Sequence, residues 1–470
     1  MTTLYRTASA PGPNGLSDWL SARLTEYAAQ FGIIGAAAAL LQGDALAQAA
    51  AGVLNVSTGV TATPDALFQL GSITKTFTAT LALQLLEQGR IELDAPVRKY
   101  LPDFGVASDR VSADLTVRHL LTHTSGIDGE FFIDTGTDSD CIQKYAQACR
   151  ALGQIHAPGD STSYCNAGFV VLGALLERVT GQSWQALLQE RIIAPLGLFR
   201  TTTDYAELPR FRVAVGHVID PASGKFAVSK RLHLPRGMGP TGATLHSSAK
   251  ELAEFGRVFM RRGSTRSGAP ILTPETIALA LMPHADWPTA RWTHLQTGLG
   301  WQLQSWGGRK TFGHDGVTFG QNSFLRVMPD ADIVLALLTT GGQESAKNLY
   351  QALFGEVFQE LAGVRPPGTP NVPVDVSYDA ERMVGRYANA STQAEVFMED
   401  GVLTLRVRMP QFAGLIPEQM WPLIPLSKDA CLILNRGLNV QEILVFHHFD
   451  PSAETPRYAS LARRDLVRLG

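Results

Sequence analysis

Residues 71–79 read GSITKTFTA and stand at the start of an apolar helical pattern that ends near Gly89. Ser72 and Lys75 are three residues apart, so a helix would place their side chains on one face. Ser72 either caps the helix predicted over 73–88, with Lys75 a solvated side chain, or is a nucleophile with a lysine as its base. The rest of the sequence has to decide between these two interpretations.

The composition is that of a globular enzyme without a strong charge bias. The chain has 470 residues, of which 45% are hydrophobic and 18% charged, and its formal net charge is −3. The length allows two or three domains, and the charge balance gives no reason to expect a nucleic-acid or membrane partner. No window is apolar over the ~18 residues of a membrane span, and the N-terminus lacks the apolar segment of a secretory signal. Four cysteines without close metal-type pairing lead us to expect a reduced, cytoplasmic protein.

The hydrophobic pattern divides the chain into two domains and a linker. Residues 1–362 begin with a helix and a buried hairpin, continue through a helical insert, and return to strands and a final helix. This order predicts an α/β fold in which helices flank an antiparallel sheet, with a helical subdomain. Residues 363–375 are rich in proline and predict a stiff linker. Residues 376–470 predict a small, mostly β domain, either a barrel or a sandwich.

Two further short motifs carry groups that acyl transfer needs. Tyr164 and Asn166 are two residues apart, so an extended segment would present both on one face. A phenol can relay a proton, and an amide can hold a substrate carbonyl or the lysine. His314 and Gly316 fall at the start of a predicted strand, where the glycine would let a substrate backbone approach closely. The N–H of Val317 would then supply an oxyanion donor.

The order S-x-x-K, Y-x-N and H-x-G resembles the penicillin-recognising serine hydrolases. It is most similar to the class C β-lactamase-like branch, with its DD-peptidases, D-aminopeptidases and esterases. The C-terminal region, with Gly385 and Tyr387, resembles more loosely the lipocalin-like domain appended to some members. Supporting matches spread the resemblance over roughly residues 15–360, at 115–126, 158–166, 239–256 and 297–301.

The resemblance implies a two-step acyl transfer that needs no metal or organic cofactor. Ser72 would be the acylated nucleophile, and Lys75 and Tyr164 would form the base and proton relay, in an order that stays open. Asn166 would orient the substrate, and the N–H groups of Ser72 and Val317 would form the oxyanion hole.

The third motif departs from the family pattern in a way that bears on the substrate. His314 replaces the lysine of the usual Lys-Thr/Ser-Gly triplet, and Asp315 stands where a hydroxyl is expected. A negative charge beside a substrate carboxylate is costly, and a neutral histidine attracts a carboxylate less than lysine does. We therefore expect ester, amide or peptide carbonyls in a small-molecule or peptide acyl substrate, with weak or no β-lactamase activity.

Three functions stay open from the sequence. The first is an esterase or D-amino-acid-type peptidase. The second is a penicillin-binding-protein-type thioesterase that releases and cyclises nonribosomal peptides, since such enzymes also pair this domain with a lipocalin-like one. The third is an inactive peptide-binding sensor, against which the intact Ser72, Lys75 and Tyr164 argue. The oligomeric state stays open, no metal site is expected, and we interpret His123 and the pair His447–His448 as structural.

Overall fold

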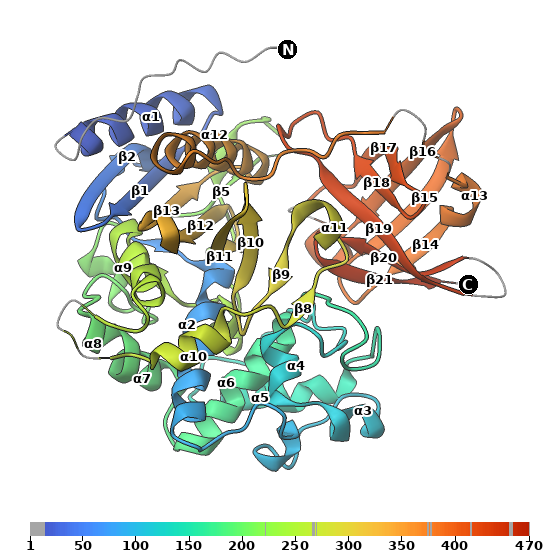
Figure 1. The fold of residues 1–470 in the computed structure, drawn as a ribbon, viewed down its shortest axis with the longest axis horizontal. Helices are drawn as coiled ribbons and strands as arrows, with labels where there is room; N and C mark the ends of the chain where they lie inside the picture. The colour runs from blue at the N-terminus through green and yellow to red at the C-terminus, as the bar shows by residue number, and fades with distance from the viewer. Residues whose placement is uncertain are drawn as a thin grey trace.

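The computed structural model describes residues 15–220, 222–265, 268, 270–373, 376, 378–413, 416–450 and 455–469. Within these residues the chain forms an α/β domain and a separate closed β-barrel at its C-terminal end (Figure 1). The predicted antiparallel sheet with flanking helices, the helical subdomain and the small all-β domain are confirmed.

The α/β domain is built on a nine-stranded sheet whose centre joins the two ends of the domain. Strand β1 (Gly35–Gln42) pairs with β13 (Ile333–Thr340), so that Gly35 lies opposite Thr340. The predicted buried hairpin is formed by β1 and β2 (Ala45–Asn55), which pair antiparallel across the turn at 42–44. The remaining strands of the sheet are β3 (Val60–Thr61), β8 (Ala285–Asp286), β9 (Gln296–Thr297), β10 (Gln302–Trp306), β11 (Arg309–Val317) and β12 (Gln321–Met328).

Strand β13 shows why this sheet needs helices on both faces. Val334, Ala336 and Leu338 belong to one hydrophobic core, and the alternating residues between them belong to another. A strand buried on both faces reads as a continuous apolar run, which is how 333–338 reads in the sequence. One face is covered by α1 (Leu16–Gln30) and α12 (Gln343–Ala362), and the other by α2 (Thr74–Glu87) and α9 (Ala249–Met260) (Figure 1).

The helical subdomain is organised around α6 (Asn166–Thr180), which ends at Gly181 in the left-handed conformation. The first eleven residues of α6 are buried, and the helix packs against α2, α4 (Val117–Leu121) and α5 (Cys141–Ala148). This packing brings the start of α6 beside the start of α2. The other helices of the domain are α3 (Asp109–Asp114), α7 (Trp184–Leu188), α8 (Ala194–Leu196), α10 (Pro274–Ala280) and α11 (Ala290–Thr293), and its short strands are β4 (Phe68–Gln69), β5 (His217–Ile219), β6 (Phe226–Val228) and β7 (His246–Ser247).

The C-terminal domain is a closed barrel rather than a sandwich. Each strand pairs with the next along the chain, and pairing of the first with the last closes the cylinder, with Arg386 opposite Leu469. Helix α12 ends at Ala362, where the first domain was predicted to end, and the predicted end of the linker at 374–375 lies outside the described residues. The barrel follows α13 (Ala380–Met383) and comprises β14 (Gly385–Ala388), β15 (Gln393–Glu399), β16 (Val402–Arg408), β17 (Gln419–Ser427), β18 (Ala430–Ile433), β19 (Glu442–Phe449), β20 (Pro456–Leu461) and β21 (Arg464–Leu469).

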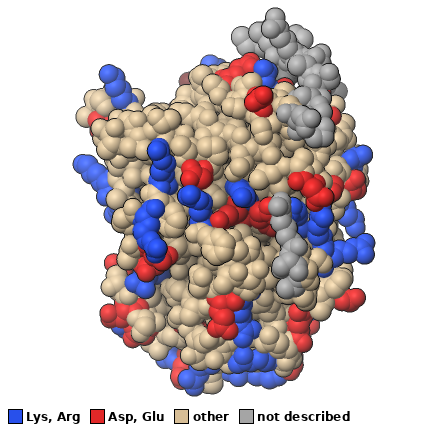
Figure 2. Space-filling model, turned by 90° about the vertical axis from the view of Figure 1, so that its left-hand side faces the viewer, with Lys and Arg blue, Asp and Glu red and all other residues tan. Residues whose placement is uncertain are grey.

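The surface carries both signs of charge in small groups. Figure 2 shows lysine and arginine interspersed with aspartate and glutamate over one face of the molecule. This mixture agrees with the nearly balanced net charge of −3. In the part of the chain that the structure describes, no helix is both long and apolar enough to cross a bilayer.

Candidate active site

Ser72 and Lys75 lie where the chain enters α2. Residues Gly71–Ile73 form a 3-10 turn, and α2 begins at Thr74. Among the described residues, no side chain caps the start of the turn or the start of α2. Ser72 is therefore not a helix cap, which removes the first interpretation of the motif. Lys75 is fully buried, Ser72 is half-buried, and Lys75 Nζ lies 3.1 Å from Ser72 Oγ within hydrogen-bond reach.

The amine of Lys75 is surrounded by oxygen atoms. Besides Ser72 Oγ, Nζ contacts Asn166 Oδ1 and the Thr241 carbonyl, each at 2.8 Å. Burial lowers the pKa of Lys75 well below its usual value; Glu130 opposes this shift and Arg464 adds to it. A neutral amine donates two hydrogens, which the two other oxygens accept, so its lone pair is left for the Ser72 hydroxyl. That arrangement suits a general base.

Tyr164 lies against the same amine. Its ring centroid is 4.8 Å from Lys75 Nζ, and the ring stacks on His123 at 4.4 Å. Burial raises the pKa of the phenol above its usual range, although Ser72 and Arg464 lower it in part. Among the described residues the hydroxyl makes no hydrogen bond of good geometry, in spite of the nearby Ser72. The phenol therefore stays protonated and can turn between Ser72 and a leaving group.

The segment around Cys165 brings Tyr164 and Asn166 to one side, as predicted. Cys165 is extended, with φ of −128°, and Asn166 is the first residue of α6. The Cys165 thiol is buried, and its sulfur accepts a hydrogen bond from the Gly168 N–H at 3.2 Å, which caps the helix. The side chains on either side of Cys165 are thus left to approach Lys75.

His314 was predicted to lie at the start of a strand. It lies inside β11, which already begins at Arg309. Its ring centroid is 6.2 Å from that of Tyr164, so it belongs to the same site. Nδ1 lies 2.6 Å from the Asp315 carbonyl, which can only accept, so Nδ1 carries the proton. Burial is the main cause that lowers the pKa of His314 to about 3. A neutral imidazole with Nε2 as an acceptor therefore stands where the family pattern has a lysine.

Gly316 is needed for packing within the chain, and the approach of a substrate backbone at this position stays a prediction. A Cβ atom at this position would lie 2.0 Å from the Leu70 carbonyl oxygen and 2.4 Å from Ser323 Oγ. The same close passage would put a Cβ at Gly71 2.8 Å from the Val317 nitrogen. The backbone of Val317 thus runs directly beside the turn that carries Ser72. The role of these two N–H groups as an oxyanion hole stays a prediction.

Asp315 is a compensated charge, so the expectation that it repels a substrate carboxylate is wrong. Asp315 Oδ1 lies 2.7 Å from Arg326 Nη1, and Oδ2 lies 4.0 Å from Arg463 Nη2. Burial alone would raise the pKa of Asp315, but the two guanidinium groups outweigh it and hold this pKa below its usual value. The carboxylate stays ionised and neutralised by its partners.

The barrel reaches the site through the hairpin of β20 and β21, which the sequence analysis did not foresee. The Tyr164 N–H donates to the Arg463 carbonyl at 2.8 Å, and the Arg464 guanidinium lies 4.8 Å from the centre of the Tyr164 ring. Arg464 also pairs with Glu130 at 3.1 Å. The one sequence signal for these residues is the pair Arg463–Arg464 in a turn between two strand patterns.

Metal ligands are not gathered here. Among the described residues, no group of three or more His, Cys, Asp or Glu side chains is placed to hold a metal ion. In the barrel, His447 Nδ1 lies 2.8 Å from His448 Nδ1, and His447 Nε2 lies 3.1 Å from Asp465 Oδ1.

Comparison with known proteins gives this geometry a context. A sequence model described as Beta-lactamase matches residues 20–355. Penicillin-binding protein 4 of Amycolatopsis lactamdurans is 40% identical over 351 residues, which are 73% of this chain and 91% of that protein. Esterase EstB of Burkholderia gladioli is 32% identical over 227 residues, 44% of this chain and 56% of that protein. The crystal structure of SurE superposes with a TM-score of 0.74 over 96% of this chain and 99% of that chain; at 23% identity the likeness concerns the fold alone.

Proposed function

The chain belongs to the β-lactamase family of serine hydrolases, and on that premise we propose that it transfers acyl groups through a covalent ester on Ser72. One observation carries the proposal: the Lys75 amine, wholly buried, lies 3.1 Å from Ser72 Oγ. A lysine in bulk water is protonated at neutral pH and cannot take a proton from serine. Burial removes that obstacle, because it disfavours the charged form.

Acylation would proceed by attack of Ser72 Oγ on a substrate carbonyl carbon. The Oγ–H proton moves to Lys75 Nζ, and the former carbonyl oxygen becomes an oxyanion beside the N–H groups of Ser72 and Val317. Collapse of this intermediate breaks the bond to the leaving group, which takes a proton through Tyr164. Each oxyanion donor in such a site contributes about 3 kcal/mol of transition-state stabilisation.

Lys75, rather than Tyr164, takes the first proton in this proposal. Burial shifts the pKa values of the two groups in opposite directions, down for the amine and up for the phenol. Both shifts favour the uncharged form, so the site holds a neutral amine and a neutral phenol. The neutral amine is the base and the neutral phenol the acid, which assigns one role to each.

The acyl donor we propose is an ester, amide or peptide carbonyl. An esterase among the relatives supports the ester, since EstB is 32% identical over 227 residues. Neutral His314 supplies no positive charge for a carboxylate, which favours weak or absent turnover of β-lactams. Attack of water on the acyl-enzyme regenerates Ser72 and yields the acid, with Tyr164 and Lys75 returning the proton.

A second candidate is release and cyclisation of a peptide thioester. The observation that favours it is the hairpin tip at Arg463, whose carbonyl accepts from the Tyr164 N–H at 2.8 Å. The barrel thus forms a wall beside the group that would handle the acceptor's proton. Incubation with a peptidyl thioester separates the candidates, because a cyclic product is lighter than the linear acid by one water.

The nucleophile can be tested by intact-protein mass spectrometry with two probes that modify a reactive serine, a fluorophosphonate and a p-nitrophenyl ester. We expect wild type and the exposed-serine control Ser57→Ala to gain an adduct, and Ser72→Ala to gain none. An adduct on folded Ser72→Ala would contradict the assignment of the nucleophile. A folded wild type that no probe modifies would favour the peptide-binding sensor instead.

A further inference from the structure

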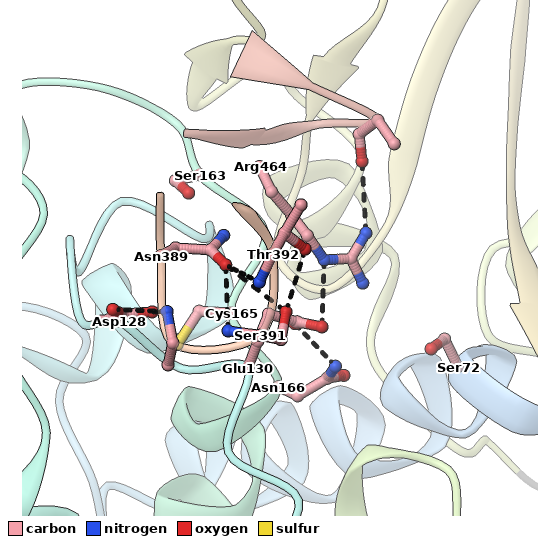
Figure 3. Close-up of polar contacts among 12 residues, drawn as sticks. Ser72, Asp128, Glu130, Ser163, Cys165, Asn166, Asn389, Ser391, Thr392 and Arg464 are labelled. Atoms are coloured by element: carbon pink, nitrogen blue, oxygen red, sulfur yellow. Dashed lines mark hydrogen bonds and ion pairs between the residues drawn. The ribbon is translucent and has the colours of Figure 1, made fainter. Parts of the chain in front are cut away.

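Glu130 links the barrel to the lysine–asparagine pair (Figure 3). Its side chain is almost completely buried, with 4% of the residue exposed. One carboxylate oxygen accepts from Asn166 Nδ2 at 2.8 Å, and the other pairs with Arg464 Nε at 3.1 Å. Figure 3 shows Glu130 between Arg464 of β21 and Asn166 of α6. A buried charge without partners is costly, and these two partners offset that cost for the Glu130 carboxylate.

Glu130 fixes the orientation of the Asn166 amide. A carboxylate can only accept, so the amide must turn its NH2 group toward Glu130. Its carbonyl oxygen then faces the other way, where it accepts from Lys75 Nζ at 2.8 Å and from Thr241 Oγ1 at 2.9 Å. With the amide reversed, Lys75 would meet an NH2 group and lose an acceptor.

Arg464 is itself held in place by hydrogen bonds that its neighbours in the chain make between the domains. The Asp465 N–H donates to Ser163 Oγ at 3.0 Å, and Ser161 Oγ donates to Asp465 Oδ2 at 2.9 Å. Together with the Tyr164 N–H bond to the Arg463 carbonyl, these contacts attach the start of β21 to the segment that carries Tyr164. The guanidinium therefore reaches Glu130 from a fixed position.

We propose that Glu130, clamped by Arg464 of the barrel, is a positioning residue for Lys75 and Asn166, and that the barrel thereby completes the active site. This inference rests on the proposed acyl transfer through Ser72. It makes the C-terminal domain part of the catalytic apparatus rather than a separate interaction module. Nothing in the individual motifs requires this, since Ser72, Lys75 and Asn166 all belong to the first domain.

The pair also has an electrostatic effect with a definite sign. Glu130 raises the pKa of both Lys75 and Tyr164, and Arg464 lowers both, although burial is the larger influence on each group. Glu130 and Arg464 therefore shift the pKa of the base in opposite directions, whether the base is Lys75 or Tyr164. The other titratable groups that act on Lys75 or Tyr164 are Arg463, Cys165, His123 and His314.

The test is the pH profile of acylation in the full chain, with a p-nitrophenyl ester as probe. The base works only when unprotonated, so its pKa sets the acidic limb of the profile. Glu130→Gln removes a negative charge and should move this limb to lower pH. Arg464→Gln removes a positive charge and should move it to higher pH, each by at least about half a unit. The double variant should lie between them, because it removes both charges of one pair.

Arg408→Gln is the matched control, since Arg408 also lies in the barrel and pairs with a glutamate, Glu418, away from the site. Its limb should coincide with that of wild type. The inference would be overturned if the variants fold and are still acylated, but the acidic limbs of their pH profiles stay in place or move in the same direction. If Glu130→Gln does not fold, Arg464→Gln decides alone through the direction of its shift. Failure of the proposed function would look different, as a wild type that is not acylated at all.

Discussion

Replacing Lys75 with methionine tests the base directly. Methionine keeps an unbranched side chain of similar length, so it can fill the space that the fully buried lysine occupies. It cannot accept the Ser72 proton. We expect acylation of Ser72 to slow by about 10²–10⁴-fold, the contribution typical of a general base, which corresponds to about 3–5 kcal/mol in the barrier. The fold should persist, because the lost contacts are two hydrogen bonds to uncharged oxygens.

The substitution should also leave a signature in the pH dependence of stability. Burial holds the pKa of Lys75 in the folded protein well below its usual 10.5. Between these two pKa values the unfolded chain binds one more proton than the folded chain, so the free energy of unfolding of wild type rises with pH. Below the folded pKa both states are protonated and the rise stops. Methionine binds no proton, so wild type should gain about 1.4 kcal/mol per pH unit relative to Lys75→Met within this window.

Urea unfolding of both proteins at about pH 7.5, 8.5 and 9.5 measures this difference. Other groups titrate in both proteins and cancel in the comparison. Lys99→Met is the control: Lys99 lies at the surface with its Nζ 2.6 Å from Glu92, and this hydrogen bond raises its pKa. The difference in free energy of unfolding between Lys99→Met and wild type should therefore stay constant over the same pH range.

The reasoning would be refuted if the difference in free energy of unfolding between wild type and Lys75→Met were also independent of pH. It would mean that the folded protein keeps the Lys75 proton in spite of complete burial. The base would then have to be the Tyr164 phenolate, against the direction in which burial moves its pKa. Retention of acylation to within about tenfold of wild type would exclude Lys75 as the base by itself.

Two further substitutions test the packing behind the site. Gly316→Ala would place a Cβ 2.0 Å from the Leu70 carbonyl oxygen, so we expect the free energy of unfolding, measured in urea, to fall by about 2–4 kcal/mol. In the control Gly153→Ala nothing lies within 4 Å of the added Cβ, so the free energy of unfolding should change little. Arg326→Met takes away the partner 2.7 Å from Asp315 Oδ1 and should cost about 2–4 kcal/mol at neutral pH. Because Arg326 helps to hold the pKa of Asp315 low and burial alone would raise it, this cost should shrink as the pH falls and the Asp315 carboxyl takes up a proton in the folded variant before it does so in folded wild type. A cost that is the same at pH ~7 and pH ~3.5 would contradict the ion-pair explanation.

The elements that could be predicted are those whose signals are local. The apolar run of α6, closed by Gly181, and the turn at 42–44 between β1 and β2 are each contained in a short window of sequence. The choice between barrel and sandwich could not be made in this way. It depends on whether β14 pairs with β21, a contact between the two ends of the domain that no local pattern encodes.

The residues of the candidate site divide in the same way, into those with a local sequence signal and those that depend on a tertiary contact. Ser72 with Lys75, and Tyr164 with Asn166, could be found because each pair is set by one local backbone geometry. Glu130 could not be found, because its role depends on a contact between a loop of the first domain and the barrel.

Gly316 shows a different limit of sequence reasoning. The sequence predicts a close backbone approach at this position, and the structure has one. The backbone that the structure places there is the chain at Leu70, a tertiary contact that no local pattern encodes.

The charges beside His314 change the argument about the substrate. From the sequence, Asp315 contributes one negative charge at the site, but Arg326 and Arg463 lie at 2.7 and 4.0 Å from its carboxylate oxygens, so this group as a whole is not negative. Repulsion of a substrate carboxylate by Asp315 therefore gives no reason to disfavour such substrates. What remains is His314, whose Nδ1–H is engaged by the Asp315 carbonyl and whose pKa of about 3 keeps it neutral. Its Nε2 is then an acceptor, so a substrate group in contact with it must donate a hydrogen, as a hydroxyl or an amide N–H does and a carboxylate does not. The proposed preference for uncharged acyl donors thus rests on the tautomer of one imidazole.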